Sequence, residues 1–259
     1  MKIQIECLGT PDLEALDRGF PIEWDALVPV LLGEDPQAIA EALVAAAANG
    51  ASPEELAGVV AYVAALRIAQ FHISNEFGDW DTALHTFTFA NAVQLGLRRT
   101  SSAELLRGVF DAAMSVYLDR FLNVPATPLP ESDGGVTNRE ALLRELPTLL
   151  DRQQQVNETG TLVSRYLSGS GSVNGMLAAL GHGLLREDRD FHTIQAIETA
   201  FRQYSLLRDS RRGIHVLIAG ARYLAAHAPT VRSQEQTFQI ARRLSRGERL
   251  FEESWPQTV

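Results

Sequence analysis

The sequence has little of the chemistry that several protein classes require. Cys7 is the only cysteine among 259 residues, which excludes an internal disulfide, a CxxC redox pair and an all-thiolate metal site. No apolar run approaches the roughly 20 residues that cross a bilayer, and the first residues carry acidic side chains where a signal peptide would be apolar. We therefore expect a cytoplasmic protein that does not enter a membrane.

Positive charge is also scarce. The 23 lysines and arginines stand against 32 aspartates and glutamates, so the net charge is −9 and the pI is about 5.2. Proteins that bind nucleic acids or anionic membranes normally present a basic surface. We therefore expect neither of these partners, whereas the hydrophobic content of 46% is ample for a packed core.

Helix signals dominate what the sequence does contain. The stretch "SPEE" at 52–55 is a capping box with proline at the first helical position. Behind it and elsewhere, apolar residues recur at the three- and four-residue spacing of helices. Only "KIQIE" at the N-terminus alternates like a strand, and it has no second strand to pair with. The pattern predicts an all-α helical bundle with helices at about 36–49, 53–73, 81–98, 102–122, 138–168, 172–185, 190–207, 211–227 and 231–246.

The two parts of the chain are similar to each other. "LHTFTFANAVQLGLRR" aligns with "FHTIQAIETAFRQYSLLR", which places His85 on His192, 107 residues later. This predicts a single all-α domain with two similar helical halves, at about 30–127 and 138–246, related by pseudo-twofold symmetry. A connector rich in proline and glycine, 123–138, joins them. In such an arrangement the two histidines would lie close to the symmetry axis.

Each half also contains a polar cluster inside otherwise apolar sequence. An apolar helix ends near a histidine, acidic residues follow, and a second histidine opens the next helix. Asp81 and Asp190 are expected to cap those next helices, because carboxylates at a helix start accept backbone N–H groups. Neutral imidazole beside carboxylates is a common metal ligand. Four of the six histidines lie in these clusters: His72, His85, His182 and His192.

These four histidines are the metal ligands that the sequence predicts, with His85 and His192 as the cofactor-binding pair. Nitrogen ligands without sulfur suit non-haem iron or another transition metal such as manganese, copper or zinc, and histidine ligation allows haem as well. The other two histidines fit structural roles. We expect His215 in the core and His227 at an exposed helix end, where a cation suits the helix dipole.

Several long motifs carry a family resemblance that covers residues 30 to 246. They are "VAYVAALRIAQFHISNEFGDWDTALHTFTFANAV", "YLDRFLNVPATPLP", "GHGLLREDRDFHTIQAIE" and "ARYLAAHAPT". Together they resemble the large helical region found beside an N-terminal Rieske-type iron–sulfur domain in certain bacterial proteins and, more distantly, the questin-oxidase-like proteins. The Cys-x-His and Cys-x-x-His ligands of a Rieske domain are missing here. The resemblance implies a redox centre in the helical region and a separate electron donor of the ferredoxin or Rieske type.

The expected function is that of a metal- or haem-dependent oxidoreductase, of the oxygenase or oxidase type, acting on a small organic substrate, with aromatic compounds among the candidates. Asn75, Glu76 and Asp79 are the candidate catalytic residues for substrate hydrogen bonding or proton transfer. Two alternatives stay open: a metal-free lyase or isomerase with His/Asp acid–base chemistry, and a non-catalytic helical module that binds a ligand. A homodimer is compatible with all of them.

Overall fold

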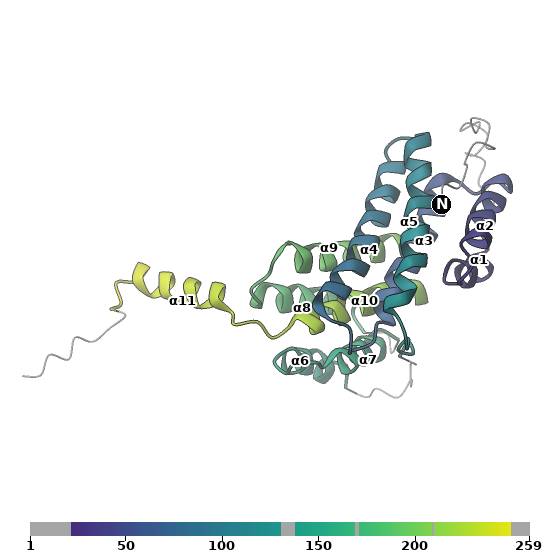
Figure 1. Cartoon of the computed structure of the whole chain (residues 1–259). Helices are drawn as coiled ribbons and strands as arrows, with labels where there is room; N and C mark the ends of the chain where they lie inside the picture. Colours follow the sequence, from purple (N-terminus) through teal and green to yellow (C-terminus); the bar gives the residue numbers. More distant parts are fainter. Residues whose placement is uncertain (1–21, 131–137, 169–170, 209, 250–259) are drawn as a thin grey trace, which may run out of the picture.

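The computed structural model describes residues 22–130, 138–168, 171–208 and 210–249, and the regular elements within these ranges are all helices (Figure 1). The predicted all-α class is confirmed. Within the described part, no helix is both long and apolar enough to cross a membrane. The helices are α1 (Trp24–Leu31), α2 (Pro36–Ala48), α3 (Pro53–Ala69), α4 (Phe77–Leu97), α5 (Ala103–Asp119), the short 3-10 helix η2 (Arg120–Leu122), α6 (Arg139–Leu150), α7 (Val156–Ser168), α8 (Val173–Arg186), α9 (Phe191–Leu207), α10 (Arg211–His227) and α11 (Ser233–Ser245).

Polar side chains fix where many of these helices begin. In the predicted capping box, Ser52 Oγ accepts a hydrogen bond from the Glu55 N–H at 3.2 Å. The Glu55 carboxylate accepts one from the Ser52 N–H at 2.9 Å in return. Each cap gives a partner to a backbone N–H group that the helix itself cannot satisfy. Other helices begin at side-chain caps from Asp35, Ser102, Asn138, Ser172, Asp190 and Ser210.

Some expected boundaries are wrong. The segment 138–168 forms two helices, α6 and α7, because the chain turns at 151–155, where Gln154 adopts a left-handed φ of 62°. A right-handed helix cannot continue through that conformation. The short helix α1 was not expected, and it contains Pro29. The proposed strand "KIQIE" lies outside the described residues, as does the part of the connector at 131–137.

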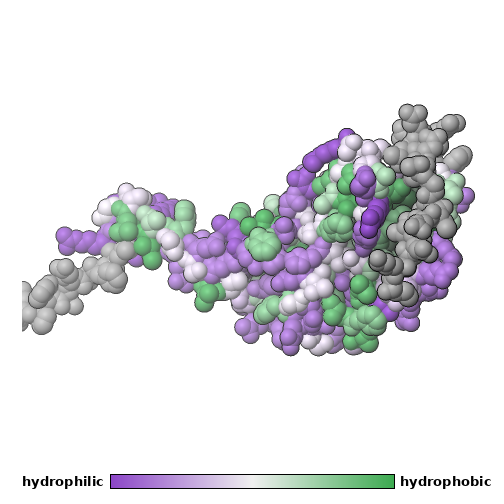
Figure 2. Space-filling view, turned by 45° about the horizontal axis from the view of Figure 1, so that its top comes forward, coloured by the Kyte–Doolittle hydropathy of each residue, from purple (hydrophilic) through white to green (hydrophobic). Residues whose placement is uncertain are grey.

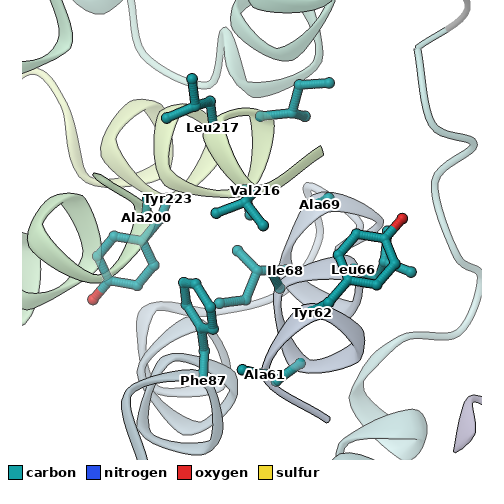
Figure 3. Packing of buried hydrophobic residues seen from close by; sticks show 14 of the residues in the cluster. Ala61, Tyr62, Leu66, Ile68, Ala69, Phe87, Ala200, Val216, Leu217 and Tyr223 are labelled. Atoms are coloured by element: carbon teal, nitrogen blue, oxygen red, sulfur yellow. The ribbon is translucent and has the colours of Figure 1, made fainter. Parts of the chain in front are cut away.

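Two central helices, α3 and α10, form the middle of the core. Both are apolar around most of their circumference and buried along most of their length, as expected for helices covered on all sides. They pack against each other, α3 also contacts α4 and α5, and α10 also contacts α7 and α9. Figure 3 shows Ile68, Phe87 and Val216 meeting where α3, α4 and α10 converge. As a result, α4 and α9 lie side by side over this centre.

The proposed internal symmetry stays a prediction. The alignment of the two halves continues beyond the histidine segments and places Gly108 on Gly213 and Tyr117 on Tyr223, so that α5 corresponds to α10. The structure places α10 between α3, α7 and α9, whereas α5 packs against α3, α4 and α2. The two helices therefore have different surroundings, although α4 and α9, which also correspond in the alignment, do contact each other.

A buried cation ties the core together. The Arg222 side chain lies in the middle of the core with 1% of its surface exposed. Its guanidinium donates to the Asn157 amide oxygen at 2.7 Å and to the Phe71 carbonyl at 2.5 Å. Burial lowers its pKa to about 10, so it keeps its charge at neutral pH. The absence of a side chain at Gly160 leaves room for the Arg222 stem, since a Cβ there would lie 3.1 Å from its Cγ.

We predict that Arg222→Leu lowers the free energy of unfolding by about 2–4 kcal/mol, because the Asn157 oxygen loses its guanidinium donor and the Phe71 carbonyl keeps only the Thr127 hydroxyl, at 3.2 Å. Urea denaturation followed by helical circular dichroism measures this. Arg202→Leu on α9 is the control: Arg202 is exposed and pairs with Glu198 on the surface, so its loss should cost less than about 1 kcal/mol. Equal unfolding midpoints for Arg222→Leu and the unsubstituted chain would contradict the role given to Arg222.

Candidate functional site

One carboxylate, that of Asp81, joins three helices at one end of the core. The Tyr223 hydroxyl donates to Asp81 Oδ1 at 2.5 Å. His227 Nε2 lies 3.7 Å from the same oxygen, and His192 Nδ1 lies 3.9 Å from Oδ2. Asp81 comes from α4, His192 from α9, and Tyr223 and His227 from the last turns of α10. A tyrosine and two histidines therefore surround a single acid.

The expectation that Asp81 caps a helix is wrong. The helix begins just after Glu76, whose backbone N–H donates to Asp79 Oδ2 at 3.0 Å. Asp79 thus supports the helix start, and Asp81 lies inside the helix, where its side chain faces α10. The matching expectation for Asp190 is confirmed, because its carboxylate accepts the Thr193 N–H at 2.9 Å at the start of α9.

The tautomer of His227 follows from its surroundings. Its Nδ1 lies 2.8 Å from the Tyr223 carbonyl oxygen. A carbonyl only accepts hydrogen bonds, so Nδ1 must carry the hydrogen. In the neutral ring the lone pair therefore belongs to Nε2. That atom is buried and has no hydrogen-bond partner in the described part of the chain. A buried nitrogen with an unused lone pair is a candidate proton acceptor.

The electrostatics favour the neutral form of this ring. Burial lowers the pKa of His227 below its usual value, and this outweighs the Tyr223 carbonyl and the carboxylates of Asp81 and Asp190, which raise it. Burial also raises the pKa of Tyr223 well above its usual value, and Asp81 adds to this effect. Tyr223 therefore stays protonated and donates to Asp81. The expectation of an exposed His227 is wrong, since the side chain is largely covered.

A cavity of about 530 Å³ lies beside this cluster. The α3–α4 turn, the turn between α6 and α7 and the end of α10 surround it. Among the lining residues, Glu76 carries the only permanent charge, and the His227 ring forms part of the wall. The lining residues are Ile73, Asn75, Glu76, Phe77, Gly78, Trp80, Gln153, Gln154, Val156, Ala226, His227, Ala228 and Pro229.

The predicted catalytic residues separate into two groups. Asn75 and Glu76 line the cavity, and the Asn75 amide donates to the Leu122 carbonyl at 2.8 Å, which fixes the turn on η2. Asp79 instead accepts the backbone hydrogen bond that supports the start of α4. Asn75 and Glu76 are thus placed to contact a bound molecule, whereas the position of Asp79 gives it a structural task.

The predicted cofactor-binding histidines do meet. His85 Nε2 and His192 Nε2 lie 3.1 Å apart, which confirms that these two histidines come together, although His85 lies inside α4 and not at its start. Phe191 lies over the His192 ring, with 3.8 Å between ring centroids. His192 Nδ1 faces the carboxylates of Asp190, at 3.7 Å, and Asp81. The pair can share one N–H···N hydrogen bond, or both nitrogens can bind one metal ion.

The other two predicted ligands lie elsewhere. His72 is half-buried, and its Nδ1 lies 2.7 Å from the Ser74 hydroxyl within its own turn. His182 is exposed and lies within α8 rather than in a turn. In the ranges that the structure covers, no three His, Cys, Asp or Glu side chains are grouped so that they could hold a metal ion.

The sequence interpretation missed Tyr223 and His227 as parts of the site. A signal was present: the two residues are four positions apart in "YLAAH", and therefore share one face of an alanine-rich helix. The expected core role of His215 is confirmed, because this side chain is buried on α10 and lies 2.7 Å from the Tyr62 hydroxyl.

No protein-family model, curated protein or solved structure matches the chain. The resemblance to Rieske-associated and questin-oxidase-like proteins therefore stays a prediction.

We predict that His227 titrates below its usual pKa of about 6.5 and that Asp81→Asn lowers this pKa further, because the variant removes a negative charge that favours the imidazolium. Asparagine can still accept the Tyr223 hydrogen bond. The His227 ring C–H shifts in an NMR pH titration report the pKa. Asp111→Asn, at an exposed position of α5, should leave it unchanged. A His227 pKa that is the same with and without the Asp81 carboxylate would contradict this electrostatic account.

Proposed function

We propose that the protein is an enzyme of the isomerase or lyase type that binds a small organic molecule in the 530 Å³ cavity and uses His227 as its general base. The observation that carries the proposal is the His227 ring itself. Its Nδ1–H is fixed on a backbone carbonyl, its Nε2 lone pair has no partner in the described residues, and the ring forms part of the cavity wall. This is the metal-free alternative that the sequence left open.

The proposed reaction begins with proton abstraction. A substrate C–H bond next to a carbonyl breaks, the proton passes to His227 Nε2, and the electron pair moves onto the carbonyl oxygen as an enolate. The new imidazolium faces Asp81 Oδ1, 3.7 Å from Nε2, which stabilises its charge. The Tyr223 hydroxyl holds that carboxylate in place. Where a C=C bond adjoins the enolate, return of the proton to the far carbon of that bond moves the double bond and completes an isomerisation. Where the neighbouring carbon carries a leaving group, the enolate electrons form a new C=C bond, the group departs with its bonding pair, and an elimination is complete.

Access to the base involves Phe77. Its ring lies 5.2 Å from the His227 ring, and the residue is 64% exposed at the first position of α4. A side chain so exposed can change rotamer at little cost. Rotation of Phe77 would open the face of His227 toward the cavity, and its return over a bound substrate would exclude water.

The lining of the cavity indicates the substrate class. Its polar groups include the amides of Asn75, Gln153 and Gln154, and its charge comes from Glu76 alone. A phosphate or a dicarboxylate would find no cation among these residues and would be repelled by Glu76. We therefore expect a neutral or cationic carbonyl compound, whose flat or apolar part packs against the aromatic rings of Phe77 and Trp80.

We predict that the protein exchanges a substrate C–H hydrogen with solvent. Neutral carbonyl compounds that bind in saturation-transfer NMR are incubated with the protein in D₂O, and mass spectrometry detects the deuterium gained. His227→Gln should slow this exchange by about 10²–10⁴-fold, while the control His182→Gln, at an exposed position of α8, should not. Undiminished exchange in His227→Gln, or no exchange of any compound that binds the cavity, would contradict the proposal.

A second function, that of a metal-dependent oxidoreductase, is favoured by the facing imidazoles. His85 Nε2 and His192 Nε2 are 3.1 Å apart, and metal–nitrogen bonds of about 2.0–2.1 Å place two neighbouring ligands at roughly such a distance. The carboxylates of Asp81 and Asp190 near His192 Nδ1 would orient the ring as outer-shell partners of a ligand do. A bound iron, manganese or copper ion would supply redox chemistry there, with electrons from a separate ferredoxin- or Rieske-type donor.

This second function predicts that the protein binds one Co²⁺ or Fe²⁺ ion per chain and that His85→Gln or His192→Gln weakens binding at least tenfold, since each removes one of two imidazole ligands. Isothermal titration and the visible spectrum of bound Co²⁺ measure this. His72→Gln serves as the control, because His72 is engaged with Ser74 in its own turn. Binding that is unaffected by either substitution in the pair would show that the pair is not a metal site.

A further inference from the structure

The helix α11 stands away from the body of the protein, and its start is held there firmly (Figure 1). The Asp188 carboxylate, in the connection between α8 and α9, accepts hydrogen bonds from the N–H groups of Ser233 and Gln234, both at 2.8 Å. It also accepts one from the Ser233 hydroxyl at 3.0 Å. A residue 45 positions earlier in the chain thus caps α11, and it fixes the point from which the helix leaves the body.

The residues just before α11 strengthen this attachment. The buried carboxylate of Glu187 accepts the Thr230 N–H at 2.7 Å and the Arg232 guanidinium at 2.8 Å. Arg232 also reaches Asp151 at 2.5 Å and adopts a left-handed φ of 56°. These contacts fix the direction in which the chain leaves α10. The body therefore holds the start of α11 so that the helix points away from the rest of the protein.

The helix itself has an apolar face that nothing covers. None of its residues is buried, and Phe238, Ile240 and Leu244 are 59%, 46% and 53% exposed. At 3.6 residues per turn, Ala241 and Leu244 lie in the middle of an apolar arc, and Phe238 and Ile240, two positions apart, lie at its opposite edges. Glu235, Gln239, Arg242 and Arg243 fall on the remaining side of the helix. Figure 2 shows apolar side chains on this separate helix. Covering such a face is favourable, by about 25 cal/mol per Å² of apolar surface.

The charge of this segment indicates which partner covers the apolar face of α11. The segment 232–249 contains five arginines and two glutamates, so its net charge is +3. Residues 1–231, which precede the arm, contain 18 lysines and arginines and 28 aspartates and glutamates, so they carry −10. The arm is thus complementary in charge to the body of another copy of the chain. An anionic membrane would attract the arm but repel the rest of the molecule.

A surface suited to receive the helix lies at the start of α9. Phe191 and Ile194 are three positions apart there, so they share one face of the helix, and both are exposed. Acidic side chains flank them, among them Asp190 and the exposed Glu198. Apolar groups bordered by carboxylates match a helix whose apolar face is bordered by arginines.

We propose that α11 packs its apolar face onto the Phe191 and Ile194 surface of a second copy of this chain, and that the exchange is reciprocal, forming a twofold-symmetric dimer. A twofold axis makes the same contact form twice. The buried area is thereby doubled, toward the roughly 1,200–2,000 Å² typical of stable interfaces. This inference is independent of the reaction proposed above.

Sedimentation velocity of the full chain from about 1 to 100 μM tests the proposal. We expect a dimer whose Kd rises at least tenfold in Leu244→Glu, on the arm, and in Ile194→Glu, on the receiving surface. Gln239→Glu makes the same change of charge on the polar side of α11 and should leave the dimer intact. All three positions are exposed, so circular dichroism should report unchanged folding.

A further variant tests whether the body must hold the arm. Asp188→Ala removes the cap and leaves the apolar face untouched, and we expect it also to weaken the dimer, though less than Leu244→Glu. A chain that is monomeric at 100 μM, or a dimer unaffected by both Leu244→Glu and Ile194→Glu, would overturn the proposal. So would a monomer that cosediments with phosphatidylcholine/phosphatidylserine vesicles and loses this ability in Leu244→Glu, because a lipid surface would then be the partner.

Discussion

A charged guanidinium in the middle of the core, that of Arg222, sets conditions that the neighbouring chain must meet. A buried cation is very costly unless oxygen atoms surround it. Here the oxygens come from the Phe71 carbonyl, just after α3, and from Asn157 on α7. Arg222 thereby joins three segments that are far apart in the sequence. All three segments, the turn after α3, the start of α7 and the end of α10, also contribute residues to the cavity wall, so the same interaction that holds the core together shapes the cavity.

The site depends on the same helix. Tyr223 follows Arg222 directly and points to Asp81 on α4, while His227 lies one turn further along α10. The small residues of α10 allow this helix to approach its neighbours closely. At Gly220, for example, a Cβ would lie only 2.8 Å from the Ala200 Cβ of α9. Close packing of α10 against α3, α7 and α9 thus positions His227, Asp81 and the cavity relative to one another. The proposed acid–base chemistry needs such fixed geometry, because proton transfer requires hydrogen-bonding distances.

Local signals in the sequence were sufficient to predict the helical class and many helix starts. Ser52 with Glu55, and Asp190 with Thr193, form caps that involve only residues three positions apart. The meeting of His85 and His192 was also predictable, from the similarity of the two segments that contain them. These features depend on short-range chemistry or on a repeated pattern, which a single sequence displays directly.

Other features depend on contacts between distant segments. The direction of Asp81 follows from a helix start four residues earlier than expected and from the position of Tyr223, 142 residues away. His227 has the sequence context of an exposed helix end, but the packing of Phe77 and Tyr223 around it covers the ring. The break between α6 and α7 depends on the left-handed conformation of Gln154, which the polar run "DRQQQ" does not specify. In each case tertiary packing overrides the local preference.

The state of the His227 ring is the most direct test of the account. Nitrogen-15 NMR of the histidine side chains at pH 7 distinguishes a ring nitrogen that carries hydrogen from one that carries a lone pair. The account predicts a neutral His227 with hydrogen on Nδ1 and the lone pair on Nε2, as its hydrogen bond to the Tyr223 carbonyl requires. A His227 that is an imidazolium at this pH, or that carries its hydrogen on Nε2 alone, would contradict its assignment as the general base.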